Sequence, residues 1–398
     1  MRIAYVCTDQ GIPVFGRKGC SIHVQEVVRA MIRAGNSVDL FTPRPEGTPP
    51  AGLESVRVHP LPIASQKHPA ARERAAFEAN DDLKVALDLH GPFDLIYERY
   101  ALWGYAGMDH AQSRGIPGLL EVNAPLIDEQ ARHRVLVDRP TAEWVAHRAF
   151  GNARALIAVS AEVAAYLAGF PDASWRTHVI PNGVDPSRFP EELAPTLPAP
   201  PGTFTVGFLG TLKPWHGVET LVEAFHRLHV VEPMVRLLIV GDGPERERLE
   251  GQIDQRGLSR STVFTGSVAP EEVPGLLASM DAAVAPYPNL SHFYFSPLKV
   301  YEYMAAGLAV AASRVGELDG LIEHEANGLL CTPGDPGELF NALLRLRQDP
   351  ALRSRLGLSA RAEMIRSHTW DAAVRRILRL AEGRRASRGA SAAIGVLR

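Results

Sequence analysis

Short apolar runs alternate with helical stretches along most of the chain, and this alternation restricts the possible folds more than any other feature. Between the first two runs, Val24, Val28 and Met31 recur at helical spacing, and Gly35 follows where such a helix would end. Strands that alternate with helices form parallel sheets, and strands this apolar are buried on both faces. We therefore predict an α/β fold with helices on both faces of a parallel sheet.

The runs expected to be strands fall into two groups. They are 3–7, 38–41, 95–97, 119–122, 156–159 and 178–180 in the first group, and 206–209, 237–240, 263–265, 282–285, 308–311 and 329–331 in the second. Between the groups, the prolines from Pro190 to Pro201 are too crowded for a helix interior or a central strand. The expected organisation is a first domain over 1–190, a linker over 191–203, a second domain over 204–369, a helix over 370–382 that packs back on the first domain, and a flexible tail over 383–398.

Composition and charge exclude several classes of protein. Lys and Arg total 42 and Asp and Glu total 45, a formal net charge of −3 over 398 residues, which argues against a nucleic-acid binder. Cys7, Cys20 and Cys331 are scattered, so neither a disulfide framework nor a cysteine-rich zinc site is expected. No apolar stretch approaches the roughly 20 residues of a membrane span, and the first residues lack the pattern of a secretory leader. We expect a cytoplasmic protein, with weak peripheral membrane contact left open.

The first glycine motif nearly matches a phosphate-binding loop. The run from Gly11 to Lys18 has Arg17 and Lys18 where a Walker A motif has Lys and Ser or Thr, so the magnesium-binding hydroxyl is missing. Gly16 and Gly19 instead predict a mobile loop whose backbone approaches a ligand closely.

The second glycine motif, 241–243, begins like a dinucleotide-binding pattern. Arg246 stands where the third glycine belongs, and no acidic residue follows at the spacing that would contact a ribose. A tight turn with Pro244 at the first helical position explains the run fully. A nicotinamide-dependent dehydrogenase is therefore disfavoured.

The chain contains no Asp-x-Asp pair, so we expect no metal and no cofactor at a diphosphate site. Helix N-termini and basic side chains would then have to supply the positive charge. One candidate is the glycine-bounded turn from Gly210 to Gly217, which carries Lys213 and His216 directly after a predicted strand. The alternative is that both side chains are ordinary solvated surface residues.

A second candidate phosphate site runs from Ser296 to Gly307. Ser296 as the cap and Pro297 at the first position predict a short helix. Its first amides and Lys299 would hold a diphosphate, and Glu302, one turn later, would accept hydrogen bonds from a ribose. The alternative is a surface ion pair between Lys299 and Glu302, which are spaced three residues apart.

The segment from Ser296 to Gly307, with the strand after it, resembles the signature of the family 4 retaining glycosyltransferases. Further stretches that resemble the family, in its order and spacing, are 181–185 followed by Phe189, 240–244 and 327–330. The resemblance covers nearly the whole chain. It implies the GT-B fold, in which two Rossmann-like doubly wound domains face each other across an interdomain cleft. The first domain would lie on the acceptor side, and the second would bind a nucleotide-sugar donor.

The resemblance also implies a donor site, residue by residue. Glu302 matches the second glutamate of the family's E-x7-E motif, which binds the nucleotide ribose. Leu298 and Lys299 lie where backbone amides meet the diphosphate. Lys213 falls where the family usually has Arg, and His216 where it usually has Lys, and both positions touch the phosphates. The expected donor-binding set is completed by Gly16, Gly19, Gly210 and Ser296.

Two positions near the sugar, Lys18 and Tyr294, depart from the family's pattern. Lys18 replaces the first glycine of the loop between donor sugar and acceptor, and Gly19 matches the second. Tyr294 stands where the first glutamate of E-x7-E contacts the sugar, and Ser291, His292 and Ser296 are the alternatives for that contact. Lys18 and Tyr294 are therefore weak candidates for acceptor or sugar contacts.

Asn123 occupies the place of a histidine that commonly follows the corresponding strand in the family. An amide can donate a hydrogen bond but cannot shuttle a proton. We expect Asn123 to contact sugar or acceptor and leave the base unassigned. Other titratable residues nearby in sequence are Glu121, Asp128, Glu129 and His133.

His216 in place of a lysine would make one phosphate contact titratable near neutral pH. From this substitution we predict that donor affinity weakens above pH 7.

These observations favour a retaining, metal-independent glycosyltransferase with Lys213, Glu302 and Asn123 in its catalytic machinery. The alternatives are a non-catalytic subunit that binds sugar nucleotides and a GT-B sugar phosphorylase. Donor base and sugar are open, and the acceptor is expected to be a small molecule, a glycan or a lipid-linked molecule. A locally basic stretch from Arg132 to Arg154 either faces an anionic acceptor or lipid, or is a solvated helical face.

Overall fold

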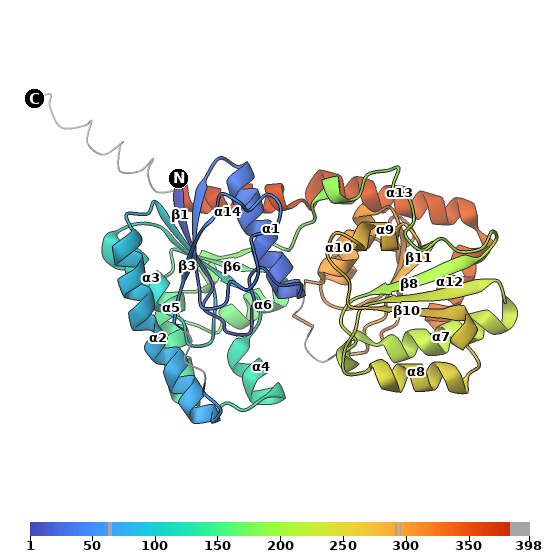
Figure 1. The fold of residues 1–398 in the computed structure, drawn as a ribbon, viewed down its shortest axis with the longest axis horizontal. Helices are drawn as coiled ribbons and strands as arrows, with labels where there is room; N and C mark the ends of the chain where they lie inside the picture. The colour runs from blue at the N-terminus through green and yellow to red at the C-terminus, as the bar shows by residue number, and fades with distance from the viewer. Residues whose placement is uncertain (63–65, 291–292, 295, 383–398) are drawn as a thin grey trace, which may run out of the picture. The chain divides into compact units, whose positions relative to one another are not determined.

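The computed structural model describes residues 1–62, 66–290, 293–294 and 296–382 (Figure 1). By its contacts the chain divides into two compact units. The first unit comprises Met1–Asn182, Tyr294–Ser296 and the helix that begins at Trp370, and the second comprises Gly183–Phe293 and Pro297–Thr369. The chain therefore changes unit at Asn182 and Gly183, eight residues before the boundary that the prolines suggest, and residues 191–203 group with the second unit.

The first unit is built on a seven-stranded sheet in which all neighbouring strands are parallel, in the order β3-β2-β1-β4-β5-β6-β7. The strands are β1 (Arg2–Val6), β2 (Ser37–Thr42), β3 (Arg57–Pro60), β4 (Leu95–Arg99), β5 (Gly118–Val122), β6 (Ala155–Ala158) and β7 (Thr177–Val179). Every residue of β4, β5 and β6 is buried, as expected of strands covered on both faces.

Helices cover both faces of this sheet. They are α1 (Gly19–Arg33), α2 (Pro69–His90), α3 (Ala106–Arg114), α4 (Leu126–His133), α5 (Arg139–Asn152), α6 (Ala161–Leu167) and α14 (Trp370–Glu382). Helix α14 packs against α1, and α3 packs against α2 and α5. The apolar side of α14 explains its place, since Val374, Ile377 and Leu378 are buried there.

The second unit is built on a six-stranded parallel sheet in the order β10-β9-β8-β11-β12-β13. Its strands are β8 (Phe204–Leu209), β9 (Val235–Val240), β10 (Thr262–Gly266), β11 (Ala282–Ala285), β12 (Ala309–Ser313) and β13 (Leu329–Cys331). Its helices are α7 (Val218–Val231), α8 (Arg246–Gln255), α9 (Val273–Leu277), α10 (Leu298–Ala305), α11 (Leu318–Leu321), α12 (Pro336–Gln348) and α13 (Pro350–Ser367). Helix α7 packs against α8 and α12, and α10 packs against α13.

Both sheets have the same strand order, in which the first strand lies between the second and the fourth of its unit. The order reverses between β1 and β4 in the first unit and between β8 and β11 in the second. Ligands of doubly wound sheets bind beyond the carboxyl ends of the strands at this reversal. Ligands are therefore expected at the loops after β1 and β8 and at the segment after β11.

The structure confirms every predicted strand to within one or two residues at its ends, and it contains one strand that the sequence pattern did not predict. This is β3 at the edge of the first sheet, whose sequence Arg-Val-His-Pro is only partly buried. An edge strand with half-exposed polar residues lacks the apolar run on which the prediction depended. The predicted flexible tail, 383–398, lies outside the described residues.

Candidate functional site

The loop after β8 places three predicted residues, Gly210, Lys213 and His216, at the reversal point of the second sheet. Gly210 begins the loop with φ of 138°, and Gly217 ends it with φ of 66°. A Cβ atom at Gly217 would lie 1.8 Å from the carbonyl oxygen of Pro286, so only glycine fits there. The short helix Pro214–His216 lies between, with Lys213 directly before it.

The main chains of two neighbouring loops meet beneath this turn. The amide of Gly210 donates to the oxygen of Val240 over 2.9 Å. A Cβ atom at Gly241 would lie 2.1 Å from the oxygen of Gly210, and one at Gly243 would lie 2.4 Å from that of Leu212. Because Gly241 and Gly243 have no side chains, the main chain of the loop after β8 can lie against this run. Helix α8 begins at Arg246, so the prediction of Pro244 at its first position was wrong.

Lys299 lies in the first turn of α10 and is 9% exposed. Its Nζ lies 4.2 Å from the ring centroid of Phe208 and 5.5 Å from that of Tyr287, and it has no hydrogen-bond partner among the residues that the structure describes. Burial lowers the pKa of the Lys299 amine to about 7. A Cβ at Gly210 would lie 2.9 Å from Nζ, so the glycine leaves the space that the amine needs.

His216 lies close to the same aromatic rings, 6.3 Å from Phe208 and 5.9 Å from Tyr287 between ring centroids. Its Nδ1 is 2.5 Å from the carbonyl oxygen of Thr211 and therefore carries the proton, since a carbonyl only accepts. Burial, together with the charge of Lys299, lowers the pKa of the imidazole to about 3. The prediction that His216 titrates near neutral pH was wrong, because the sequence did not reveal this burial.

Lys213 is half-buried, and its Nζ lies 5.5 Å from the ring centroid of Trp215. The charges of Lys213 and Lys299 both act on His216, which lies near both. The structure thus brings Gly210, Lys213, His216 and Lys299 together at one edge of the second sheet.

The first turn of α10 has no side-chain cap and no acidic residue. Its N-cap is Pro297, not Ser296, and Leu298 is the first helical residue, so the predicted serine cap was wrong. Ser296 is engaged elsewhere: its Oγ accepts a hydrogen bond from the amide of Asn182 over 3.3 Å, and its carbonyl oxygen accepts from Asn182 Nδ2 over 2.7 Å. The amides at the start of α10 therefore have no competing side-chain acceptor in their own cap.

Glu302 does not pair with Lys299. Its Oε1 lies 3.1 Å from Nη1 of Arg188, and both side chains are largely shielded from solvent. The alternative of a surface pair between Lys299 and Glu302 was therefore wrong. Sequence reasoning missed Arg188 because 114 residues separate it from Glu302.

Tyr294 belongs to the first unit and is held there by two hydrogen bonds. Its hydroxyl donates to Oε2 of Glu129 over 2.9 Å, and its carbonyl oxygen accepts from Ser160 Oγ over 3.0 Å. The contact between Tyr294 and a sugar stays a prediction. Ser291 and His292, the alternatives for that contact, lie outside the described residues.

The loop after β1 holds the glycines predicted for the first unit. At Gly16 a Cβ atom would lie 2.8 Å from Cγ of Pro13, whereas none of the described atoms lies within 4 Å of such a position at Gly19. Gln25 of α1 donates to the oxygen of Gly16 over 2.9 Å and ties the loop to the helix. Lys18 is the N-cap of α1, and its Nζ donates to the oxygen of Gly11 over 3.3 Å.

Asn123 follows β5 and belongs to a network around Glu121. Arg99 donates to the Asn123 side-chain oxygen, and Asn123 Nδ2 donates to Oε1 of Glu121. His23 Nε2 lies 2.6 Å from the same Oε1, and the Tyr97 hydroxyl donates to the carboxylate. One amide hydrogen of Asn123 is left for a ligand.

Although burial raises the pKa of Glu121, the charges and hydrogen bonds of His23, Arg99 and Tyr97 together lower it to about 2. Sequence reasoning missed these three partners. The signal was an arginine and a glutamate within otherwise apolar strands, since charged residues are buried only when they are paired.

The basic stretch from Arg132 to Arg154 includes several paired side chains. Arg139 pairs with Asp128 and Glu143, and Arg148 pairs with Asp109. These contacts favour the interpretation as an ion-paired helical face over an anion-binding surface.

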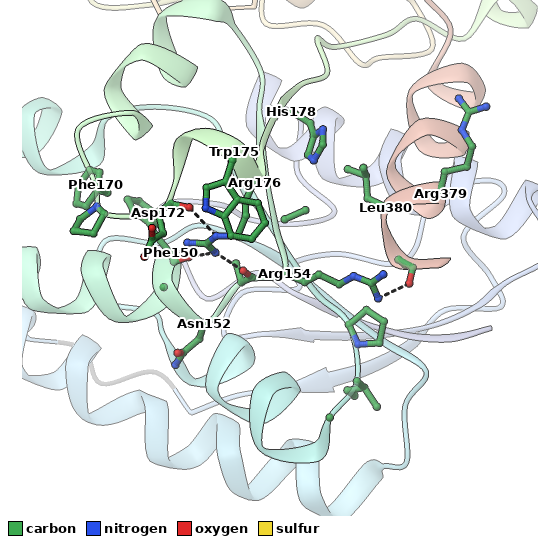
Figure 2. A pocket seen from close by; sticks show the side chains of 18 of the residues that line it. Phe150, Asn152, Arg154, Phe170, Asp172, Trp175, Arg176, His178, Arg379 and Leu380 are labelled. Carbon is green, nitrogen blue, oxygen red and sulfur yellow. Dashed lines mark hydrogen bonds between the residues drawn. The ribbon is translucent and has the colours of Figure 1, made fainter. Parts of the chain in front are cut away.

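A hollow of about 1280 Å³ opens at the opposite edge of the first sheet, where β4, β5 and β6 begin (Figure 2). Two of the arginines that line it, Arg154 and Arg176, donate to main-chain oxygens at helix ends. Arg154 donates to the oxygen of Ala381 over 2.7 Å, and Arg176 donates to that of Phe150 over 2.7 Å. The hollow therefore lies away from the carboxyl ends of the strands, and Arg154 and Arg176 cap the ends of α14 and α5.

Within the described part of the chain, no three His, Cys, Asp or Glu side chains are placed to hold a metal ion. No described helix is long and apolar enough to cross a membrane.

Two family models match the chain. The model described as Glycosyltransferase Family 4 matches residues 17–188, and the model described as Glycosyl transferases group 1 matches residues 203–349.

Individual proteins extend these matches. The 2-deoxystreptamine glucosyltransferase of Streptomyces kanamyceticus is 30% identical over 67% of this chain and 71% of its own length. The sucrose-phosphate synthase of Thermosynechococcus elongatus superposes with a TM-score of 0.76 at 25% identity, over 97% of this chain and 99% of that one. HepE of Anabaena, solved in complex with UDP-glucose, superposes with a TM-score of 0.71 at 20% identity, over 96% and 100%.

Proposed function

This chain belongs to the family 4 glycosyltransferases and has the GT-B fold of two Rossmann-like domains, and from this premise we propose that it is a retaining, metal-independent enzyme. It transfers a sugar from a nucleoside-diphosphate sugar to an acceptor that is a small molecule, a glycan or a lipid-linked molecule. We expect a UDP-sugar as donor, because HepE was solved with UDP-glucose.

The observation that carries this proposal is the buried amine of Lys299. A buried ammonium group without a hydrogen-bond partner destabilises a protein unless an anion binds to it. The uncapped start of α10 and the side chain of Lys213 lie in the same unit and favour negative charge as well. A diphosphate, whose oxygens accept several hydrogen bonds at once, satisfies all three groups.

In the proposed reaction the bond between the anomeric carbon and the diphosphate oxygen breaks, and its electron pair stays on the phosphate. Positive charge grows on the sugar ring while negative charge grows beside Lys299 and Lys213. The acceptor hydroxyl attacks from the same face, and its proton passes to the leaving phosphate oxygen. Donors fixed before the reaction stabilise this charge without reorganisation.

The remaining predicted residues have binding roles in this proposal. Glu302 accepts hydrogen bonds from the ribose hydroxyls, and the backbone amide of Leu298 contacts the diphosphate. Asn123 donates its remaining amide hydrogen to sugar or acceptor, and Gly19 leaves room for the sugar. His216 is neutral, and its Nδ1 donates to the carbonyl oxygen of Thr211. Its Nε2 can therefore accept a hydrogen bond, but the side chain adds no positive charge to the diphosphate site.

The experiment measures binding of UDP-, GDP-, ADP- and dTDP-glucose to the whole chain by calorimetry, and then turnover across an acceptor panel with excess EDTA present. We expect one nucleotide to bind most tightly, nucleoside diphosphate to be released, and the product to keep the α configuration by NMR. Lys213→Met should weaken binding at least tenfold, and the exposed Lys67→Met should not. Strict dependence on a divalent ion, or an inverted product, would contradict the proposal.

Release of free sugar phosphate in place of nucleoside diphosphate would favour a phosphorylase. Binding without turnover would favour the non-catalytic subunit, an alternative suggested by the two departures at Tyr294 and Asn123.

A further inference from the structure

Arg188 contacts the carboxylate of Glu302 and is itself held at several points. Its Nη1 lies 3.1 Å from Glu302 Oε1, and its Nη2 donates to the carbonyl oxygen of Pro270 over 2.9 Å. The guanidinium carbon lies 5.4 Å from the ring centroid of Phe189. All four residues belong to the second unit.

The short helix that carries Arg188, Pro186–Arg188, is fixed by its neighbours. Asp185 caps it, with Oδ1 accepting from the Ser187 amide over 3.0 Å and from the Ser187 hydroxyl over 2.6 Å. Phe189 is buried, and Arg361 donates to its carbonyl oxygen over 2.6 Å. The guanidinium therefore starts from a defined backbone position.

The contact between the two charged groups involves one nitrogen and one oxygen. Nη1 donates to the carboxylate, and Nη2 donates to the carbonyl oxygen of Pro270. An ionised carboxylate has about four acceptor positions, and the contact with Arg188 uses one of them. Arg188 thus orients Glu302 while occupying one acceptor position of its carboxylate.

A glutamate on a helix surface ordinarily samples several rotamers, and ordering them costs free energy when a ligand binds. The side chains of Arg188 and Glu302 are only 22% and 16% exposed, so solvent screens their attraction less than it screens a surface pair. The contact with Arg188 therefore orders the Glu302 side chain before the nucleotide binds, so that less free energy is lost on binding.

We propose that Arg188 is a positioning residue that holds the Glu302 carboxylate in the orientation in which it accepts the ribose hydroxyls of the donor. This inference rests on the proposed function, since it takes the ribose as the ligand of Glu302. It makes Arg188 a determinant of selectivity for ribose over deoxyribose, although Arg188 itself does not touch the nucleotide.

The test first identifies the tightest of UDP, GDP and ADP by calorimetry and then compares it with its 2′-deoxy and 3′-deoxy forms. The full-length chain should bind the ribose form at least tenfold more tightly than one of the deoxy forms, as expected for hydrogen bonds to a charged group. Arg188→Met should weaken binding of the ribose form and bring this ratio close to one. Arg188→Lys, which restores the charge but not the planar fork, should recover part of the ratio.

Kinetics give a second readout. An interaction with the ribose is made equally in the ground state and the transition state, so Arg188→Met should raise the donor KM and leave kcat nearly unchanged. The matched control is Arg227→Met, which breaks an exposed pair with Glu223 in the same unit and should leave the ratio and the KM unchanged.

Equal weakening of ribose and deoxyribose binding by Arg188→Met and Arg188→Lys would overturn the inference, because a merely structural role lowers all affinities together. If Arg188→Met does not fold, Arg188→Lys decides by the same ratio. Glu302→Ala distinguishes failure of this inference from failure of the ribose assignment in the proposed function. If Glu302→Ala abolishes the ratio and the Arg188 variants keep it, only this inference fails; if Glu302→Ala also keeps it, the ribose assignment in the proposed function fails.

Discussion

The two sheets share one strand order, yet the polar groups at their carboxyl ends are arranged in opposite ways. In the first unit the buried carboxylate of Glu121 is paired with His23 and Arg99. In the second unit the amine of Lys299 is buried with no hydrogen-bond partner among the described residues. Paired buried charges stabilise one conformation, whereas an unpaired one favours binding of a counter-ion. One backbone plan thus carries both a completed network and a buried amine that, in the proposed function, a ligand completes.

The largest effect is expected from breaking the completed network. Arg99→Met removes a partner of Glu121 and Asn123 and leaves a buried carboxylate with fewer contacts. The free energy of unfolding should fall by about 3–5 kcal/mol in urea titrations. The exposed Arg314→Met, which breaks a surface pair with Asp319, should change it little. If Arg99→Met lowers the free energy of unfolding by less than about 1 kcal/mol, the pair of Arg99 and Glu121 contributes no more than a surface ion pair.

The corresponding change in the second unit should affect activity instead of stability. Lys299→Met keeps an apolar chain between Phe208 and Tyr287 and removes a buried charge. We expect kcat/KM to fall about 100- to 1000-fold, or about 2.7–4 kcal/mol, if the amine stabilises the leaving phosphate. Calorimetric Tm should stay equal or rise. Normal turnover with a lowered Tm in Lys299→Met would show that the buried amine stabilises the fold and does not serve activity.

A smaller effect, with a defined direction, concerns pH. The pKa of Lys299 is lowered by burial from 10.5 to about 7, so this amine is mostly uncharged above neutrality when no donor is bound. Donor binding above pH 7 must then take up a proton, so Kd should rise up to about tenfold per pH unit between pH 7 and 9 and stay flat below about pH 6. The unfolded amine holds its proton up to pH 10.5, so stability should increase with pH over the same interval.

Two variants identify the side chain whose titration causes this pH dependence. The pKa of His216 is lowered to about 3, so His216→Asn should keep the pH dependence, whereas Lys299→Met should lose it. Titrations in buffers of different ionisation enthalpy measure the proton uptake directly. Loss of the pH dependence in His216→Asn alone would restore the histidine as the titrating group.

The smallest effect is expected at Tyr294. Tyr294→Phe removes one hydrogen bond to Glu129, which should lower the free energy of unfolding by about 0.5–1.5 kcal/mol. If the hydroxyl serves only this contact, the donor KM should be unchanged. A raised KM with unchanged Tm would instead show that Tyr294 contacts the sugar in place of a glutamate.

Much of the fold could be predicted because it depends on local patterns. Runs such as 282–285 are apolar throughout, and the whole strand β11 is buried. Strand β3 escaped prediction because its side chains are half-exposed at a sheet edge. The end of a helix was less predictable than its existence, since Pro297 and not Ser296 is the cap of α10.

The candidate site was predictable only in its residue types. Lys213, Lys299 and Glu302 were named from motifs, but the partner of Glu302 lies 114 residues away and leaves no local trace. The burial of His216 depends on Phe208 and Tyr287, which come from other segments. Charge states follow from such surroundings, and these exist only once the chain has folded.

The contact between the loops after β8 and β9 limits how this chain can be redesigned. Main-chain atoms of Gly210 and Leu212 lie where any side chain at Gly241 or Gly243 would have to be. A mutant library that varies these positions would sample mostly misfolded proteins, whatever donor is selected for. Changes in these loops are therefore compatible with the fold at outward side chains but not at Gly241 and Gly243.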